Sequence, residues 1–188
     1  MESLMKYLIE EDVAITATPA VFEPYTNSEV VHGGGLEALA PGIQNLVLSH
    51  YANGVNNDSL SRVLYQKNLY WIKKFHDMGG HLIVGTDPTG AGRTLAGYAN
   101  QHTIEILNEA GFSLPESIEI ATRSGAEFLE VLNMKGTIEV NKQADLVIID
   151  GDLGEDISNI RNMEIVFRKG IGYDSGKIFD SVKGKVGL

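Results

Sequence analysis

The sequence contains no cysteine, and this absence excludes disulfide bonds, thiol catalysis and every zinc site built on thiolate ligands. Basic side chains are also scarce, because 15 Lys and Arg stand against 25 Asp and Glu, giving a formal net charge of −10. Such a surface repels polyanions, so we expect no nucleic-acid partner. No apolar run approaches the roughly 18 residues that a membrane span requires, and the first residues lack the pattern of a signal peptide. We therefore expect a cytoplasmic protein without a membrane partner.

Apolar residues make up 43% of the 188 residues, which is enough for one sizeable core. The first part of the chain alternates between helix and strand patterns. We predict helices over 3–11, from a cap at Asp58 or Ser59 to Phe75, over 100–110 and over 113–132, and strands over 13–22 and 81–87. Residues 24–57 are rich in Gly, Pro and Asn, which predicts a long loop or short irregular helices. This alternation favours an α/β fold with a parallel sheet.

Two of these helices carry more detailed signals. In the helix that ends at Gly79-Gly80, one apolar stripe is predicted to face the core, and it consists of Leu60, Val63, Leu64, Trp71, Ile72 and Phe75. In the region 113–132, capping boxes are predicted at Ser113 with Glu116 and again at Ser124 with Glu127.

From Gly136 onward the pattern changes to short strands separated by turn residues. The predicted strands have the sequences GTIEV, ADLVIID, MEIVFRKG and IGYD. We therefore predict a domain boundary near 134–136, which divides the chain into residues 1–134 and 135–188.

Asp87 is the leading candidate for chemistry. It ends the apolar run HLIVGTD, whose composition is typical of a buried parallel strand. A carboxylate at the carboxyl end of such a strand faces the crevice where α/β folds hold ligands, and there it can bind a metal ion or transfer protons. The alternative is that Asp87, followed by Pro88, begins a turn or caps a helix.

Two glycine-rich segments are similar to motifs of other functions, but neither motif is complete. Gly90 to Arg93 follows a strand, as a phosphate-binding turn does, but the third glycine of G-x-G-x-x-G is replaced by Leu95 and no P-loop occurs. A nucleotide-binding domain is therefore disfavoured, and Arg93 either binds a substrate carboxylate or is solvated. The HGGG segment at 32–35 is typical of an esterase oxyanion hole, but the G-x-S-x-G nucleophile is absent.

The five histidines do not have metal-chelating spacing. His76 and His81 are predicted to be structural. His50 lies in the predicted loop, where a functional role is open, and His102 in the first turn of a helix is ambiguous.

Four segments together resemble the C-terminal part of the amidohydrolase superfamily of metal-dependent hydrolases. GGHLIVGTDPTG is similar to the end of the last strand of its (β/α)8 barrel, and LPESIEIAT to a late barrel helix. GTIEVNKQADLVIID is similar to the entry into its small β-sandwich domain, and SLMKYLIEEDVAITATPAVFEPYT to the helix and strand before the last barrel unit. The resemblance implies an α/β fold formed by the last two units of a TIM barrel, with part of a β-sandwich.

The resemblance also implies a site. Asp87 matches the strand-end aspartate that binds the metal and exchanges protons with the attacking water, while Thr86 and Arg93 border the substrate by adjacency. The implied cofactor is a divalent metal ion, with Zn as the family-based expectation. The implied reaction is hydrolysis of a C–N bond in an amide, cyclic imide or dipeptide-like small molecule.

A complete barrel needs about 250 residues, and the family's first-strand H-x-H, bridging lysine and later histidine ligands have no counterparts here. We therefore expect the chain alone to be inactive and to associate with itself or with a missing N-terminal half of the enzyme. The competing hypothesis is a non-catalytic, oligomerising assembly module, because open strand edges associate.

Overall fold

The computed structural model describes residues 1–26, 35–54, 59–88 and 94–187. Its helices are α1 (Glu2–Glu10), α2 (Pro19–Phe22), α3 (Pro41–Gly54), α4 (Ser59–Asp77), α5 (Tyr98–Glu109), α6 (Leu114–Glu119), α7 (Gly125–Phe128) and α8 (Ser175–Val182). Its strands are β1 (Ile15–Ala17), β2 (Leu82–Val84), β3 (Leu146–Ile149), β4 (Met163–Arg168) and β5 (Ile171–Asp174). Short helical turns are η1 (Glu23–Thr26), η2 (Leu36–Ala38), η3 (Ile120–Ser124) and η4 (Ile157–Arg161), of which η3 is π-helical.

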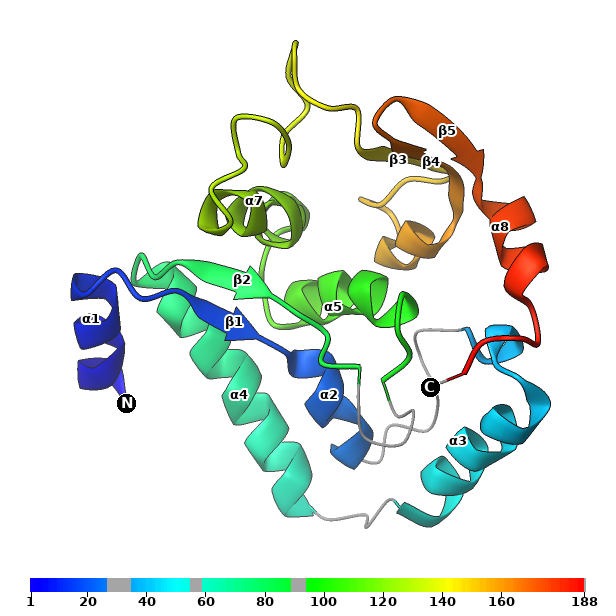
Figure 1. The fold of residues 1–188 in the computed structure, drawn as a ribbon. Coiled ribbons are helices and arrows are strands. Elements are labelled where there is room, and N and C mark those ends of the chain that lie inside the picture. The colour runs from blue at the N-terminus through cyan, green and yellow to red at the C-terminus, as the bar shows by residue number, and fades with distance from the viewer. Residues whose placement is uncertain (27–34, 55–58, 89–93, 188) are drawn as a thin grey trace.

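Strands β1 and β2 form a parallel pair in which Ile15 lies opposite Leu82 and Ala17 opposite Val84 (Figure 1). The predicted parallel strand at 81–87 is thus confirmed in place and direction. The strand predicted over 13–22 is too long, because Pro19 occupies the first turn of α2 and the chain is helical from there. Proline at this position has its φ already set for a helix and has no N–H to leave unpaired.

Helix α4 runs beside the parallel pair and ends where the two glycines predict (Figure 1). The Gly80 amide donates to the Phe75 carbonyl and the Gly79 amide to that of His76, which is a Schellman motif with Gly79 at a φ of 91°.

The predicted stripe of α4 is correct only in its second half. Ile72 and Phe75 are buried together with Tyr65 and Leu69. Leu60, Val63 and Leu64 are exposed, because the buried face is the one that contacts η1, α2 and β2.

Replacement of Gly79 by alanine is expected to lower the free energy of unfolding by about 1 kcal/mol, because an L-residue pays for the left-handed conformation there. No atom lies within 4 Å of the added Cβ, so backbone strain is the only effect. Gly42, in α3 and equally uncrowded, has no positive φ. Gly42→Ala is the control and should leave stability unchanged or slightly raised. Urea denaturation of both variants measures the difference, and equal midpoints would contradict the assignment of the cap.

Helix α3 corrects the interpretation of residues 24–57 as a long loop, while the alternative of short irregular helices is confirmed in part by η1 and η2. Fourteen residues from Pro41 form a regular helix, with Pro41 at its start. The C-terminal tail returns to this region, since the Ala40 amide donates to the Val186 carbonyl and the Val186 amide to the Ala38 carbonyl.

The region 113–132 also differs in part from expectation. The capping box of Ser113 and Glu116 is present in full at the start of α6. The predicted second start at Ser124 is wrong, because Ser124 is helical, makes no capping hydrogen bond, and joins the π-helical turn η3 to α7.

Strands β3, β4 and β5 form an antiparallel sheet, with Leu146 opposite Phe167 and Phe167 opposite Gly172. Three of the four predicted C-terminal strands are therefore confirmed. GTIEV is not a strand, and its Ile138 and Val140 are each 90% exposed. Its pattern suits a strand, but among the described residues it has no neighbouring strand to pair with.

The described residues thus form a mixed α/β fold with no closed barrel and one small antiparallel sheet. The main core joins both strands of the parallel pair to α1, α4 and α5, and Phe75, Leu82, Ile106 and Phe112 are among its most deeply buried large side chains. Within the described parts of the chain, no helix is long and apolar enough to cross a membrane.

Candidate functional site

The carboxyl ends of β1 and β2 meet at one edge of the parallel pair, where the Gly85 amide donates to the Ala17 carbonyl at 2.9 Å. Thr86 follows half-buried and Asp87 is exposed. Asp87 has a φ of 45°, a left-handed conformation that aspartate adopts more readily than most residues. The strand therefore stops at a sharp change of direction that turns the Asp87 carboxylate out at the edge.

A hollow of about 440 Å³ lies beside this edge, between the parallel pair and the antiparallel sheet. Thr86 from β2's end and Gln101 and Ile104 from α5 line one part of it. Ile160 and Met163, from the C-terminal region, line the opposite part. Thr86, the residue before Asp87, thus shares this hollow with side chains of α5 and of the C-terminal region.

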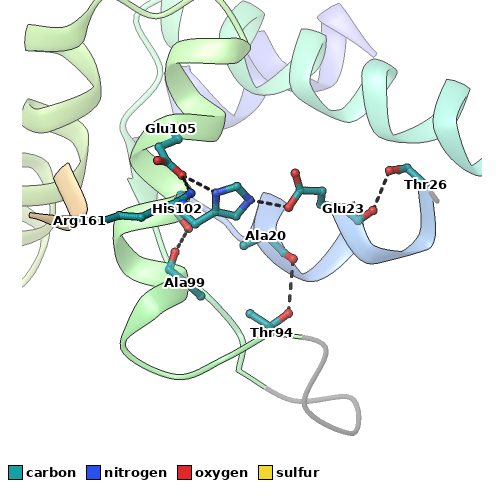
Figure 2. A network of polar contacts seen from close by, with 9 residues as sticks. Ala20, Glu23, Thr26, Thr94, Ala99, His102, Glu105 and Arg161 are labelled. Carbon is teal, nitrogen blue, oxygen red and sulfur yellow. Dashed lines mark hydrogen bonds and ion pairs between the residues drawn. The ribbon is translucent and has the colours of Figure 1, made fainter. Parts of the chain in front are cut away.

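A cluster of four charged side chains lies close to the end of β1 (Figure 2). His102 of α5 places Nε2 2.6 Å from a carboxylate oxygen of Glu23 and Nδ1 2.7 Å from one of Glu105. Arg161 of η4 pairs with the same oxygen of Glu105. The side chains of His102, Glu23 and Glu105 are 13%, 15% and 11% exposed, so this charge cluster is largely removed from water.

Both ring nitrogens of His102 face carboxylates, which can only accept hydrogen bonds when ionised. Burial by itself lowers the pKa of His102, but the hydrogen bonds to Glu105 and Glu23 and their negative charges outweigh it and raise the pKa to about 9. His102 is therefore an imidazolium at neutral pH, and with Arg161 it balances the two glutamates.

Two neighbours complete the surroundings of the charge cluster. Thr94 donates from Oγ1 to the Ala20 carbonyl at 3.4 Å, which ties the chain after Asp87 to α2 (Figure 2). Burial, and then the charge of Glu23, raise the pKa of Tyr65 well above its usual range. The Tyr65 hydroxyl thus stays neutral.

The other candidate residues from the sequence are Arg93 and the remaining histidines. Arg93 lies outside the described residues, as do His32 and the segment 89–93. His50 lies in helix α3. His81 donates a hydrogen bond from Nε2 to the Ser124 carbonyl, 3.1 Å away, and His76 packs edge-to-face on Phe112, so both rings make contacts within the fold.

The charge cluster itself was not predicted. The spacing of His102 and Glu105, three residues apart on one helix, is a signal that a sequence contains. Glu23 and Arg161 come from segments far away in the chain, and no local pattern indicates them.

Among the residues that the structure describes, no group of three His, Asp or Glu side chains could hold a metal ion. His102 does not provide one, because its two nitrogens point in opposite directions and each already faces a carboxylate. The described residues therefore do not make up a metal site by themselves, and Asp87 contributes a single carboxylate.

Known proteins similar to this chain share its fold. The sequence profile of the Amidohydrolase family matches residues 38–172. A prolidase complexed with N-methylphosphonate-L-proline superposes with a TM-score of 0.64 at 19% identity, over 93% of this chain and 38% of that one. The ochratoxinase of A. niger superposes with a TM-score of 0.58 at 18% identity, over 93% of this chain and 35% of that one. A Xaa-Pro dipeptidase with bound methionine superposes with a TM-score of 0.54 at 22% identity, over 72% of this chain and 34% of that one.

These solved structures are considerably longer proteins, of which the chain spans little more than a third. Comparison with curated proteins gives no match.

Proposed function

Because the chain belongs to the amidohydrolase family, we propose that it is the C-terminal segment of a metal-dependent hydrolase that cleaves a C–N bond. In fold terms, residues 1–134 supply the last two units of a (β/α)8 barrel and residues 135–188 part of a small β-sandwich. The observation that carries the proposal is Asp87, an exposed carboxylate directly after a parallel strand. Carboxyl edges of parallel strands are where barrels place their catalytic groups.

Asp87 is proposed to accept a proton from the attacking water and return it to the leaving nitrogen. Thr86 and Arg93 are proposed to contact the substrate. The prolidase and dipeptidase names among the similar structures favour a dipeptide-like substrate over a cyclic imide. The described residues do not complete a metal site, so the other ligands of the proposed Zn are assigned to a segment outside this chain.

That segment is proposed to be an N-terminal half of the enzyme, and the structure offers it two places to bind. In the parallel ladder, the Ile83 and Gly85 amides point to β1, so the Leu82 and Val84 backbone groups point to the opposite edge of β2. Ile138 and Val140 lie in the segment GTIEV, which is not a strand, and are almost fully exposed. Unpaired edges and exposed apolar residues of this kind favour association with a further strand.

The same features favour the second candidate, a non-catalytic module that pairs with itself. Self-association is therefore expected for both candidates, and light scattering should show a dimer or larger species at micromolar concentration. A monomer would contradict that expectation. A nucleotide-binding α/β domain is the third candidate, and it requires thermal stabilisation by NAD or ATP.

Reconstitution tests the proposed enzyme function. The chain is produced with and without the N-terminal part of the similar prolidase, which is proposed to supply the histidine and lysine ligands that the family resemblance implies, and hydrolysis of Xaa-Pro dipeptides is measured with added Zn²⁺ or Mn²⁺. Turnover is expected from the pair and from neither part alone.

Two results would overturn this proposal. Turnover by the isolated chain that disappears in Asp87→Asn would mean that its own residues complete the site. A stable complex without turnover would instead support the assembly module.

A further inference from the structure

The charge cluster of Glu23, His102, Glu105 and Arg161 joins three elements that are distant in sequence. Glu23 belongs to η1 after β1, His102 and Glu105 to α5, and Arg161 to η4 in the C-terminal region. Figure 2 shows the imidazole between the two carboxylates, and Arg161 pairs with the Glu105 oxygen that also faces the ring. A single connected set of ion pairs therefore links α5 to η1 and to η4.

The cluster requires His102 to carry two protons. With carboxylate oxygens at 2.6 and 2.7 Å from its two nitrogens, a neutral ring would direct a lone pair at one of them. That contact would be repulsive and largely shielded from water. The geometry is thus satisfied in one protonation state only.

Along the sequence, His102 and Arg161 of the charge cluster are adjacent to residues that line the hollow beside Thr86. His102 lies between Gln101 and Thr103, and Arg161 follows Ile160, and these neighbours line the hollow. Since α5 carries charge-cluster residues on one side and hollow-lining residues on another, the ion pairs act on the same helix that forms part of the wall of the hollow. Thr94, which bonds to Ala20, ties the chain after Asp87 to the same end of β1.

We propose that His102, as an imidazolium, is a positioning residue that sets the spacing of the walls of the hollow beside Thr86 and Asp87. This inference rests on the proposed function, because it assigns a role to that hollow in a site built around Asp87. The groups that face His102 are Glu23 from η1 and Glu105 from its own helix, with Arg161 from η4 behind Glu105. Tyr65 from α4 adds a neutral hydroxyl close to Glu23.

Methyl NMR of the full chain between pH 6 and 10.5 tests the proposal. The methyl resonances of Ile104, Ile160 and Met163, in the walls, should shift together with one midpoint near the pKa of His102, about 9. Ile106 is the internal control, because it lies on the same helix but is buried in the main core. Its resonance should stay constant over that range.

Three variants make the result specific. His102→Gln should abolish the transition, and Glu23→Gln, which removes one of two carboxylates, should lower its midpoint by about one pH unit or more. His76→Gln, the same change at a histidine of α4, should leave the transition intact. If wall and core methyls shift together, or if the transition persists in His102→Gln, the proposal is wrong.

The measurement needs neither metal nor substrate. Failure of the methyl titration therefore overturns the positioning role and leaves the proposed hydrolase function standing. Failure of the reconstitution with a normal titration removes the enzyme function while the coupling of His102 to the hollow is retained.

Discussion

Asp87→Asn is expected to lower hydrolysis by the reconstituted pair by about 10²- to 10⁴-fold, the range typical of a lost general acid–base group. The amide has the size of the carboxylate but cannot accept a proton from water at neutral pH. Asparagine also tolerates the left-handed conformation that Asp87 adopts at a φ of 45°. The fold should therefore persist, and the loss should be in kcat, measured by steady-state kinetics beside a thermal melt.

Asp12→Asn provides the matched control. Asp12 is also exposed and also has a positive φ, of 54°, but it precedes β1 and so lies toward the amino end of the parallel pair. The same chemical change there should leave turnover within about twofold of wild type, as expected for a surface substitution. Equal losses in the two variants would show that net charge, and not the position of Asp87, governs activity.

The sequence predicted those elements whose signals are local. Gly79 and Gly80 end α4, Ser113 and Glu116 form a capping box, and the apolar run before Asp87 forms a parallel strand. In each case the residues that carry the signal also make the stabilising contacts, so a short window contains all the information.

Predictions that depended on tertiary partners were less accurate. Leu60, Val63 and Leu64 continue an apolar stripe, yet the face of α4 that is buried is decided by what packs against it. Ile138 and Val140 alternate as in a strand, but a strand is stabilised by its neighbours, and the described residues provide none.

The residues of the candidate site differ in the same way between those indicated by local sequence and those brought together by tertiary packing. The position of Asp87 after a parallel strand could be predicted because strand and carboxylate are adjacent in sequence, while its role in a site stays a prediction. The charge cluster could not, because Glu23, His102 and Arg161 meet only after three separate elements have packed. The sequence holds only the helical pair of His102 with Glu105, a common surface arrangement that gives no indication of burial.

The stability of the chain is expected to fall as the pH rises from 6.5 to above 9. The pKa of His102 is raised from 6.5 to about 9 in the folded state, so folding favours the protonated ring. Its contribution is fully present below pH 6.5, decreases as the pH passes between the two values, and is lost above about 9. At about 1.4 kcal/mol per pKa unit, this interval corresponds to at most about 3.5 kcal/mol. Urea unfolding at pH 6, 7.5, 9 and 10 measures it.

His102→Gln separates this effect from all other titrations. The variant should be less stable than wild type at pH 6, because it leaves Glu23 and Glu105 largely buried beside each other with Arg161 as the remaining cation. The difference between the two proteins should then shrink as the pH rises, because wild type loses the same charge. Tyr65 does not contribute in this range, since its pKa is raised far above it. A constant difference from pH 6 to 10 would mean that His102 stabilises the fold by packing, and that its charge is not what holds α5 between η1 and η4.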